Sequence, residues 1–200
     1  MKIGYCVEGA TDRAVIRGLQ RRWCPDAQLI EGSFRGSTQL GLRREIPKIC
    51  DELDSKGCDI IVLLTDSNAM PHQEVGRAQR QRVPNKFQSR VLSGVAARNI
   101  ESWLCCDRDW IASMTSRQPA EFAQEDPKAV LETALGISAT ERREDHIATL
   151  VFEAPLKQWI ARSPSFESFY EAARDLSQSA LGRSLGCAIP NEREKSSKTN

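Results

Sequence analysis

Three acidic residues stand at positions where an α/β protein can use them for chemistry. Glu8 follows the apolar residues 3–7, Asp66 ends the run DIIVLLTD, and Glu101 opens a helical segment within ARNIESW. In parallel α/β folds, ligands bind in the crevice outside the carboxyl ends of the strands. If the strands before Glu8 and Asp66 are neighbours, both carboxylates face one crevice. Paired oxygen ligands of this kind predict a Mg²⁺ or Mn²⁺ site, and such a metal usually serves a phosphate group.

Each acid also has a simpler interpretation. An acid after a strand is often only a cap or turn residue, and the sequence DSN from Asp66 favours a turn. Glu101 in the first turn of a helix would complement the helix dipole. His72 is close enough in sequence to Asp66 to assist it, the alternative being an ordinary surface-loop histidine.

Six basic residues occur from Arg77 to Arg98, although the net charge of the whole chain is only +1. No acid occurs between Arg77 and Arg98. The planar fork of arginine matches phosphate, so this stretch is predicted to position a nucleic-acid backbone without reading its sequence. The alternative is a solvated helix face. The predicted nucleic-acid contacts are Arg77, Arg80, Arg82 and Lys86.

The hydrophobic pattern predicts four strands that alternate with helices. The continuous apolar run at residues 60–64 is typical of a strand buried on both faces of a parallel sheet. Repeated strand-helix-strand units imply right-handed crossovers and a mainly parallel α/β sheet. The predicted strands are residues 2–7, 27–34, 58–65 and 89–97.

The predicted helices begin and end at recognisable residues. Gly9 permits a tight turn after the first strand, Thr11 is the expected cap of the first helix, and Asp12 would complement its dipole. Ser37 or Thr38 would cap the second helix, which runs to about residue 53 with Pro47 inside it. Asp107 is the expected cap of its own helix. Later helices are predicted at residues 99–106, 107–114, 127–135, 140–160 and 166–179.

The chain is expected to form an α/β domain over residues 1–107, with a helical region over 108–190 packed on it and a disordered tail at 191–200. Its 200 residues, 40% of them hydrophobic, contain no apolar run near the ~20 residues that span a bilayer. No signal-peptide pattern opens the sequence. The seven cysteines show no CxxC or His/Cys ligand spacing, so a zinc site is not expected. Cys6, Cys50 and Cys58 lie in or beside apolar segments and are expected to be buried thiols. We therefore expect a cytoplasmic protein.

Two motifs together resemble a known family. The turn CVEGATD at residues 6–12, followed by LLTDSN at residues 63–68, is similar to the toprim domain of type IA and II topoisomerases, bacterial primases, OLD-family nucleases and small ribosomal-RNA maturases. The signature of that domain is a Glu-Gly turn after strand one and an Asp-x-Asp motif after strand three, which chelate divalent metal for phosphoryl transfer.

Further segments resemble a standalone bacterial toprim-like family of unknown function. These are ARNIESWLCCD at residues 97–107 and SPSFESF at residues 163–169. Members of that family carry a helical C-terminal region and are often encoded beside ABC-type ATPases, as in anti-phage systems. The resemblance also makes residues 36–41 the glycine-rich turn before helix two.

Carried over by position, the resemblance gives roles to several residues. Glu8 would act in acid–base catalysis and metal ligation, Gly9 would form its turn, and Asp66 would be the first aspartate of the pair. Asn68 stands where the second aspartate is expected. Its carbonyl oxygen can still face Mg²⁺, but it lacks a charge, which weakens the expected site. Glu101 becomes an added acidic ligand.

The expected function is a Mg²⁺- or Mn²⁺-dependent nuclease acting on DNA or RNA phosphodiesters. Its expected site residues are Glu8, Asp66, Asn68 and Glu101. The alternative is a catalytically weak toprim-like binding or sensor subunit that partners an ABC-type ATPase, which Asn68 favours. A third interpretation is a phosphatase or another phosphotransferase acting on small molecules. Without a P-loop, self-contained ATP hydrolysis is not expected. The sequence leaves a homo-oligomer open.

Overall fold

The protein is built on a four-stranded sheet in which all strand pairs are parallel. The computed structural model describes residues 1–34, 38–114, 118, 120, 126–135 and 140–193. The strand order is β2-β1-β3-β4. In register, Tyr5 of β1 lies opposite Glu31 of β2 on one side and Val62 of β3 on the other. The strands are β1 (Lys2–Cys6), β2 (Gln28–Glu31), β3 (Ile60–Asp66) and β4 (Val91–Ala96).

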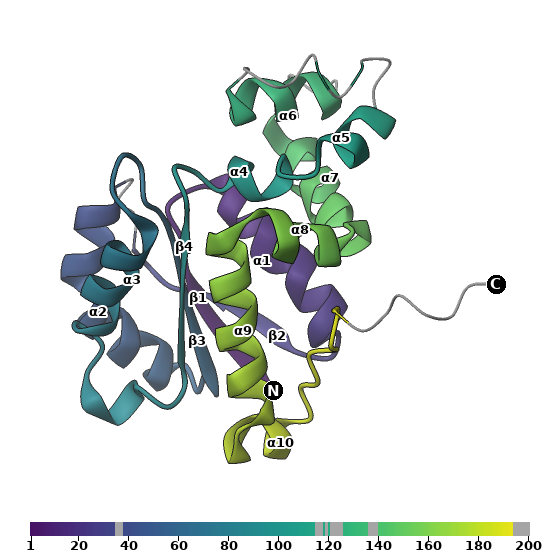
Figure 1. The fold of residues 1–200 in the computed structure, drawn as a ribbon. Helices are drawn as coiled ribbons and strands as arrows, with labels where there is room; N and C mark the ends of the chain where they lie inside the picture. The colour runs from purple at the N-terminus through teal and green to yellow at the C-terminus, as the bar shows by residue number, and fades with distance from the viewer. Residues whose placement is uncertain (35–37, 115–117, 119, 121–125, 136–139, 194–200) are drawn as a thin grey trace.

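Helices cover both faces of this sheet, which confirms the predicted α/β architecture with a parallel sheet and a helical C-terminal region (Figure 1). The helices up to β4 are α1 (Ala10–Trp23), α2 (Gln39–Ser55), α3 (His72–Arg80) and the 3₁₀ turn η1 (Asn85–Phe87). The later ones are α4 (Glu101–Leu104), α5 (Arg108–Ser113), α6 (Pro127–Leu135), α7 (Thr140–Glu153), α8 (Leu156–Arg162), α9 (Pro164–Gln178) and α10 (Ala180–Leu185).

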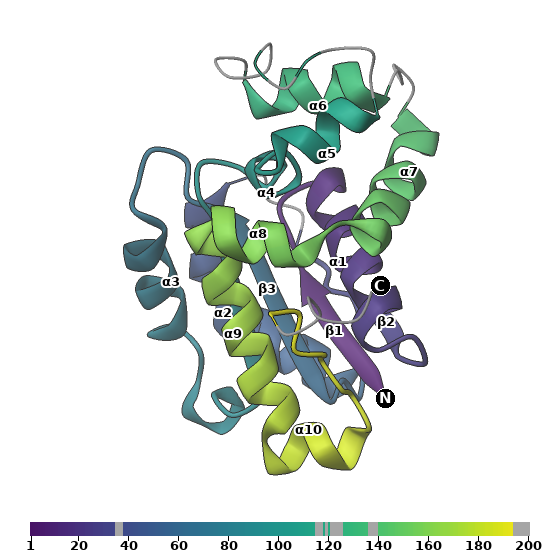
Figure 2. The ribbon, with the colours of Figure 1, turned by 45° about the vertical axis from the view of Figure 1, so that its right-hand side comes forward.

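Strand β3 supplies both hydrophobic cores because successive side chains of a strand point to opposite faces. Ile61 and Leu63 pack with apolar residues of α2. Ile60, Val62 and Leu64 pack on the other face, with residues of α1, α7, α8 and α9. The core that contains Ile60, Val62 and Leu64 is continuous from β1 through the C-terminal helices. Figure 2 shows α8 and α9 on the same side of the sheet as α1.

Two glycines allow close packing between elements. An added Cβ at Gly18 of α1 would lie 2.5 Å from the Cβ of Val151 on α7. At Gly94 of β4 it would lie 2.6 Å from Phe169 of α9. The absence of side chains at these positions therefore sets how closely the C-terminal helices approach the rest of the fold.

The residues that cap the helices agree with the sequence predictions at α2 and α5 but not at α1. The prediction that Thr11 caps α1 is wrong: Gly9 is the N-cap and makes no side-chain bond, so the helix begins one residue before Thr11. Thr38 does cap α2, accepting a hydrogen bond from the N–H of Gly41. Asp107 caps α5 by accepting from the N–H of Trp110, as predicted.

The single helix predicted at residues 140–160 is two helices. Chain direction changes at Ala154 and Pro155, between α7 and α8. Proline lacks an N–H and crowds the preceding turn, which favours a break at this point. The change of direction lets α7 lie along α1 while α8 leads into α9 (Figure 2).

The end of the chain is held to the core as far as the structure describes it. Glu192 is buried, its carboxylate pairs with Arg22 at 3.1 Å, and its N–H donates to the hydroxyl of Tyr170. Residues 194–200 of the expected tail lie outside the described residues, as do residues 35–37 of the glycine-rich turn.

Cys24 and Cys187 form a disulfide between the end of α1 and the segment after α10, with their Cα atoms 5.3 Å apart. Cys6, Cys50 and Cys58 are buried thiols that belong to no disulfide in the described part of the chain, as expected. Within the described part of the chain, none of the helices combines the length and apolar character that crossing a membrane requires.

Candidate metal centre

A cavity of about 450 Å³ opens at the carboxyl edge of the sheet. Strands β1 and β3 are neighbours, so the residues that follow them lie side by side there. The cavity is lined by the acidic residues Glu8, Asp12, Asp66, Glu101 and Glu144, together with Lys128 of α6. Three residues predicted from sequence, Glu8, Asp66 and Glu101, are thus brought to one place.

Glu8 is held by the strand beside it. Its Oε1 atom accepts hydrogen bonds from the hydroxyl of Thr65 and, at 3.2 Å, from the N–H of Asp66. Burial raises the pKa of Glu8, and the hydrogen bond from Asp66 opposes that rise. Since Thr65 is fully buried, the position of Glu8 Oε1 is fixed by the end of β3.

Asp66 and Asp12 are the most strongly perturbed acids of the cavity. Burial raises the pKa of Asp66 to about 8, with further contributions from the charges of Asp12, Glu8 and Glu101. Burial likewise raises the pKa of Asp12 to about 7, assisted by Glu8 and Glu101. One carboxylate oxygen of each aspartate, Oδ1, is buried and has no hydrogen-bond partner among the described residues.

These orphaned oxygens bear on whether the site fits a divalent cation. Unprotonated carboxylates need a partner when buried, and hard oxygens are the ligands that Mg²⁺ and Mn²⁺ prefer. As placed, no three or more Asp, Glu, His or Cys side chains of the described residues form a group that could hold a metal ion. The residues fit a cation in type and neighbourhood, and binding would require their side chains to turn toward a common point. The residues that would hold it are Glu8, Asp12, Asp66 and Glu101.

Asp12 was not among the residues proposed for the site from sequence. It was expected only to complement the helix dipole, yet it is 4% exposed and lines the cavity. A signal was present in the sequence: Asp12 shares the apolar face of α1 with Val15, Leu19 and Trp23, which are three, seven and eleven residues further on. A carboxylate on the buried stripe of a helix is informative because charged residues there are rare.

Asn68, in contrast, does not line the cavity. It is exposed and has a left-handed backbone, with φ of 52°. Its N–H donates to the carbonyl of Arg98 at 2.9 Å, and the N–H of Arg98 donates to the Ser67 hydroxyl. Arg98 also has positive φ, 66°, which is strained for a residue that is neither Gly nor Asn. These bonds join the loops after β3 and β4 beside the cavity.

The predicted basic residues lie elsewhere. Arg77 and Arg80 line a separate pocket, Arg82 is exposed, and none of the three lines the acidic cavity. Lys86 pairs with Asp51 of α2 at 2.8 Å. His72 does not line the cavity either, and burial lowers its pKa.

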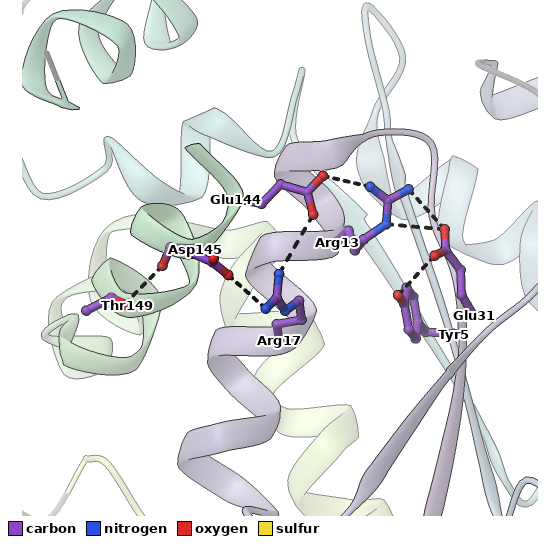
Figure 3. Close-up of polar contacts among 7 residues, drawn as sticks. All are labelled: Tyr5, Arg13, Arg17, Glu31, Glu144, Asp145 and Thr149. Atoms are coloured by element: carbon purple, nitrogen blue, oxygen red, sulfur yellow. Dashed lines mark hydrogen bonds and ion pairs between the residues drawn. The ribbon is translucent and has the colours of Figure 1, made fainter. Parts of the chain in front are cut away.

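A network of ion pairs joins α1 to the end of β2 and to α7, which carries the cavity residue Glu144 (Figure 3). Arg13 of α1 bonds to Glu31 at the end of β2 and, at 2.8 Å, to Glu144 of α7. One turn along α1, Arg17 bonds to Asp145 at 2.8 Å. Tyr5 donates to Glu31, and burial, followed by the charge of Glu31, raises the pKa of Tyr5 to about 12. The network ties α7, and with it Glu144, to α1.

Comparison of the chain with models of known protein families, with curated proteins and with solved structures finds no match.

Proposed function

We propose that the protein is a toprim-like, Mg²⁺- or Mn²⁺-dependent nuclease that hydrolyses phosphodiester bonds of DNA or RNA. The observation that carries the proposal is the group of carboxylates at the carboxyl edge of the sheet, formed by Glu8, Asp12, Asp66 and Glu101. Asp12 and Asp66 each have a buried oxygen with no hydrogen-bond partner among the described residues. Such a group is unfavourable by itself, because like charges in a buried site repel one another. A divalent cation would offset the negative charge and serve as a partner for the buried oxygens, and the bound cation would attract a phosphate group.

Each of the charged residues of the cavity would have a defined role in the reaction. The cation, which when bound polarises a phosphate oxygen, would be held by Glu8, Asp12, Asp66 and Glu101. Glu8 would also exchange a proton with the attacking or leaving oxygen, a role supported by its raised pKa and by the hydrogen bond that holds its Oε1 at Thr65. Lys128 lines the same cavity and supplies a positive charge for a non-bridging phosphate oxygen.

The test is cleavage of supercoiled plasmid and of a single-stranded RNA with Mg²⁺, Mn²⁺ or EDTA. Cleavage should require metal and fall about 100-fold or more in Glu8→Gln and in Asp66→Asn. Glu74→Gln, which changes an exposed acid of α3, is the control and should cleave normally. Metal-independent cleavage, or cleavage unaffected by both cavity variants, would refute the proposed site.

A second function is supported by Asn68, which adds no ligand to the cavity. In that case the protein is a catalytically weak toprim-like subunit that partners an ABC-type ATPase. Mn²⁺ binding measured by calorimetry, lost in Asp66→Asn but without cleavage of either nucleic acid, would favour this function over the nuclease.

A further inference from the structure

A second polar pocket lies on the opposite face of the sheet from α9, between the end of α3 and the beginning of β4. Its volume is about 390 Å³. Its polar groups come from Arg77, Arg80, Gln81, Gln88 and Ser93, and Val91 forms part of its wall. It shares no lining residue with the acidic cavity, and no described acidic side chain lines it.

Arg77 and Arg80 carry charge that no described acidic residue neutralises. They are three residues apart in the last turn of α3 and therefore on one side of that helix. Both are exposed, and neither forms an ion pair with any residue that the structure describes. The neighbouring cations differ: Lys86 pairs with Asp51, and Arg90 pairs with Asp54 at 2.5 Å.

The wall of the pocket holds a polar atom without a partner. Ser93 is on the α3 side of β4, and its Oγ is buried with no hydrogen-bond partner in the described part of the protein. A buried hydroxyl without a partner is unfavourable, since it loses its bonds to water. Gln88 donates from Nε2 to Oδ1 of Asn85 at 3.1 Å, which engages one of its two amide hydrogens. Arg77 and Arg80 are therefore the charged donors of the pocket, and the Ser93 hydroxyl is a neutral donor in its wall.

We propose that this pocket binds a phosphate group, independently of the acidic cavity. Two guanidinium groups that point from one side of a helix match the oxygens of a phosphate, and each can donate two parallel hydrogen bonds. The Ser93 hydroxyl supplies a further donor from the pocket wall. The phosphate belongs either to a free phosphate-bearing small molecule or to the backbone of a nucleic-acid strand, and the same donors recognise both.

Binding is tested by calorimetric titration of the full-length protein with inorganic phosphate, a nucleoside 5′-monophosphate and a short single-stranded DNA with hydroxyl ends. EDTA is present throughout, at constant ionic strength, so that no metal in the acidic cavity contributes. We expect phosphate binding that weakens about tenfold or more in Arg77→Gln and in Arg80→Gln. Binding of the monophosphate but not the DNA assigns the pocket to small molecules; DNA binding displaced by inorganic phosphate assigns it to a strand.

Two matched variants separate a built pocket from general attraction. Arg82→Gln removes the same charge from an exposed residue outside the pocket, and it should bind phosphate normally. Ser93→Ala should weaken binding severalfold while the protein stays as stable as the wild type or becomes more stable. Equal weakening in Arg82→Gln, or no measurable binding of any of the three probes by the wild type, would overturn the proposal. Because the titrations are metal-free, their failure leaves the proposed nuclease site untouched, and the reverse also holds.

Discussion

Asp12 and Asp66 place two carboxyl groups where burial and neighbouring acids disfavour their charged forms. Their pKa values of about 7 and about 8 lie well above the ordinary value of 3.8. A group whose pKa is higher in the folded state stabilises the fold fully below its unfolded pKa, and that stabilisation is lost as the pH rises through the folded pKa. The metal-free protein should therefore lose stability between about pH 4 and about pH 8.

Asp12→Asn should remove much of this loss. Asparagine keeps the shape of the side chain but carries no charge to bury, so we expect the metal-free variant to exceed the wild type in free energy of unfolding by on the order of 2 kcal/mol at about pH 8. The difference should shrink toward about pH 4. Urea denaturation across this pH range, in EDTA, measures it.

The control for this variant is Asp26→Asn, which changes an exposed acid near the opposite end of α1. It should follow the wild-type pH dependence. Saturating Mg²⁺ should reverse the order of stability of the wild type and Asp12→Asn. At 100 times the dissociation constant it should raise the free energy of unfolding of the wild type by about 2.7 kcal/mol, and that of Asp12→Asn by less. An Asp12→Asn protein that is less stable than the wild type at every pH would contradict a repulsive acidic cluster.

At the level of residues, the sequence predicted where the acidic cavity lies better than it predicted which residues line the cavity. Glu8, Asp66 and Glu101 could be found because strand ends and helix starts are local patterns. Asp12 was missed because its helix position suggested a dipole role, and its burial depends on α7 and α4, which are distant in sequence. Asn68 was included from resemblance alone, and its left-handed backbone directs it outside the cavity lining.

The contact between α1 and α7 depends on Gly18. An alanine Cβ there would lie 2.5 Å from Val151 Cβ and 2.6 Å from the carbonyl oxygen of Ala148. Neither neighbour is the flexible end of a long side chain, so the helices must separate. We expect Gly18→Ala to lower the free energy of unfolding by about 1–3 kcal/mol or more, although alanine favours helix formation.

Gly76→Ala is the matched comparison, because Gly76 is also a buried glycine in a helix. Its added Cβ would meet Val95 at 3.6 Å and Arg80 at 3.8 Å, which are ordinary contacts. This variant should be neutral or up to about 1 kcal/mol more stable. Thermal or urea unfolding of the two variants side by side tests the packing; equal effects would mean that the α1–α7 contact is looser than described.

The ion pairs between α1 and α7 should contribute less than this packing. Arg13 and Glu144 are about one-third and one-quarter exposed, so water screens their attraction. A double-mutant cycle with Arg13→Ala and Glu144→Ala should give a coupling energy of about 0.2–1 kcal/mol. A coupling well above that range would show that the network of Figure 3 acts as a buried unit.

The elements themselves were largely predictable. All four strands were identified, because a run such as residues 60–64 is apolar on both faces and only a central parallel strand buries both. The break at Pro155 was missed because the apolar periodicity continues from α7 into α8. The Gly9 cap was missed because Thr11 is the better cap residue by type. Helix α1 instead begins directly after the turn that contains Glu8.

At the scale of the whole molecule, one core joins the sheet to the C-terminal helices. Strand residues such as Val62 pack in the same cluster as Trp159 and Tyr170. Edge-to-face contacts of Trp103 and Trp159 with Phe166 extend it toward α4, where the Trp103 indole donates to Ser165. The helix that carries Glu101 is therefore positioned by residues more than 60 places away in the sequence. Sequence patterns close to Glu101 do not reveal these contacts.

The Cys24–Cys187 disulfide closes this architecture across a sequence separation of 163 residues. A cross-link over so long a loop restricts the unfolded chain strongly, so we expect its loss to lower the free energy of unfolding by about 2–4 kcal/mol. Reduction of the wild type and the double variant Cys24→Ala, Cys187→Ala should both show the decrease in urea denaturation. The reductant should not change the stability of the double variant, because that variant lacks the disulfide.

Thiol titration of the denatured protein counts the cysteines that react before and after reduction. If all seven cysteines react without reductant, the ends of α1 and of the C-terminal segment are held together by packing and by the Arg22–Glu192 pair alone.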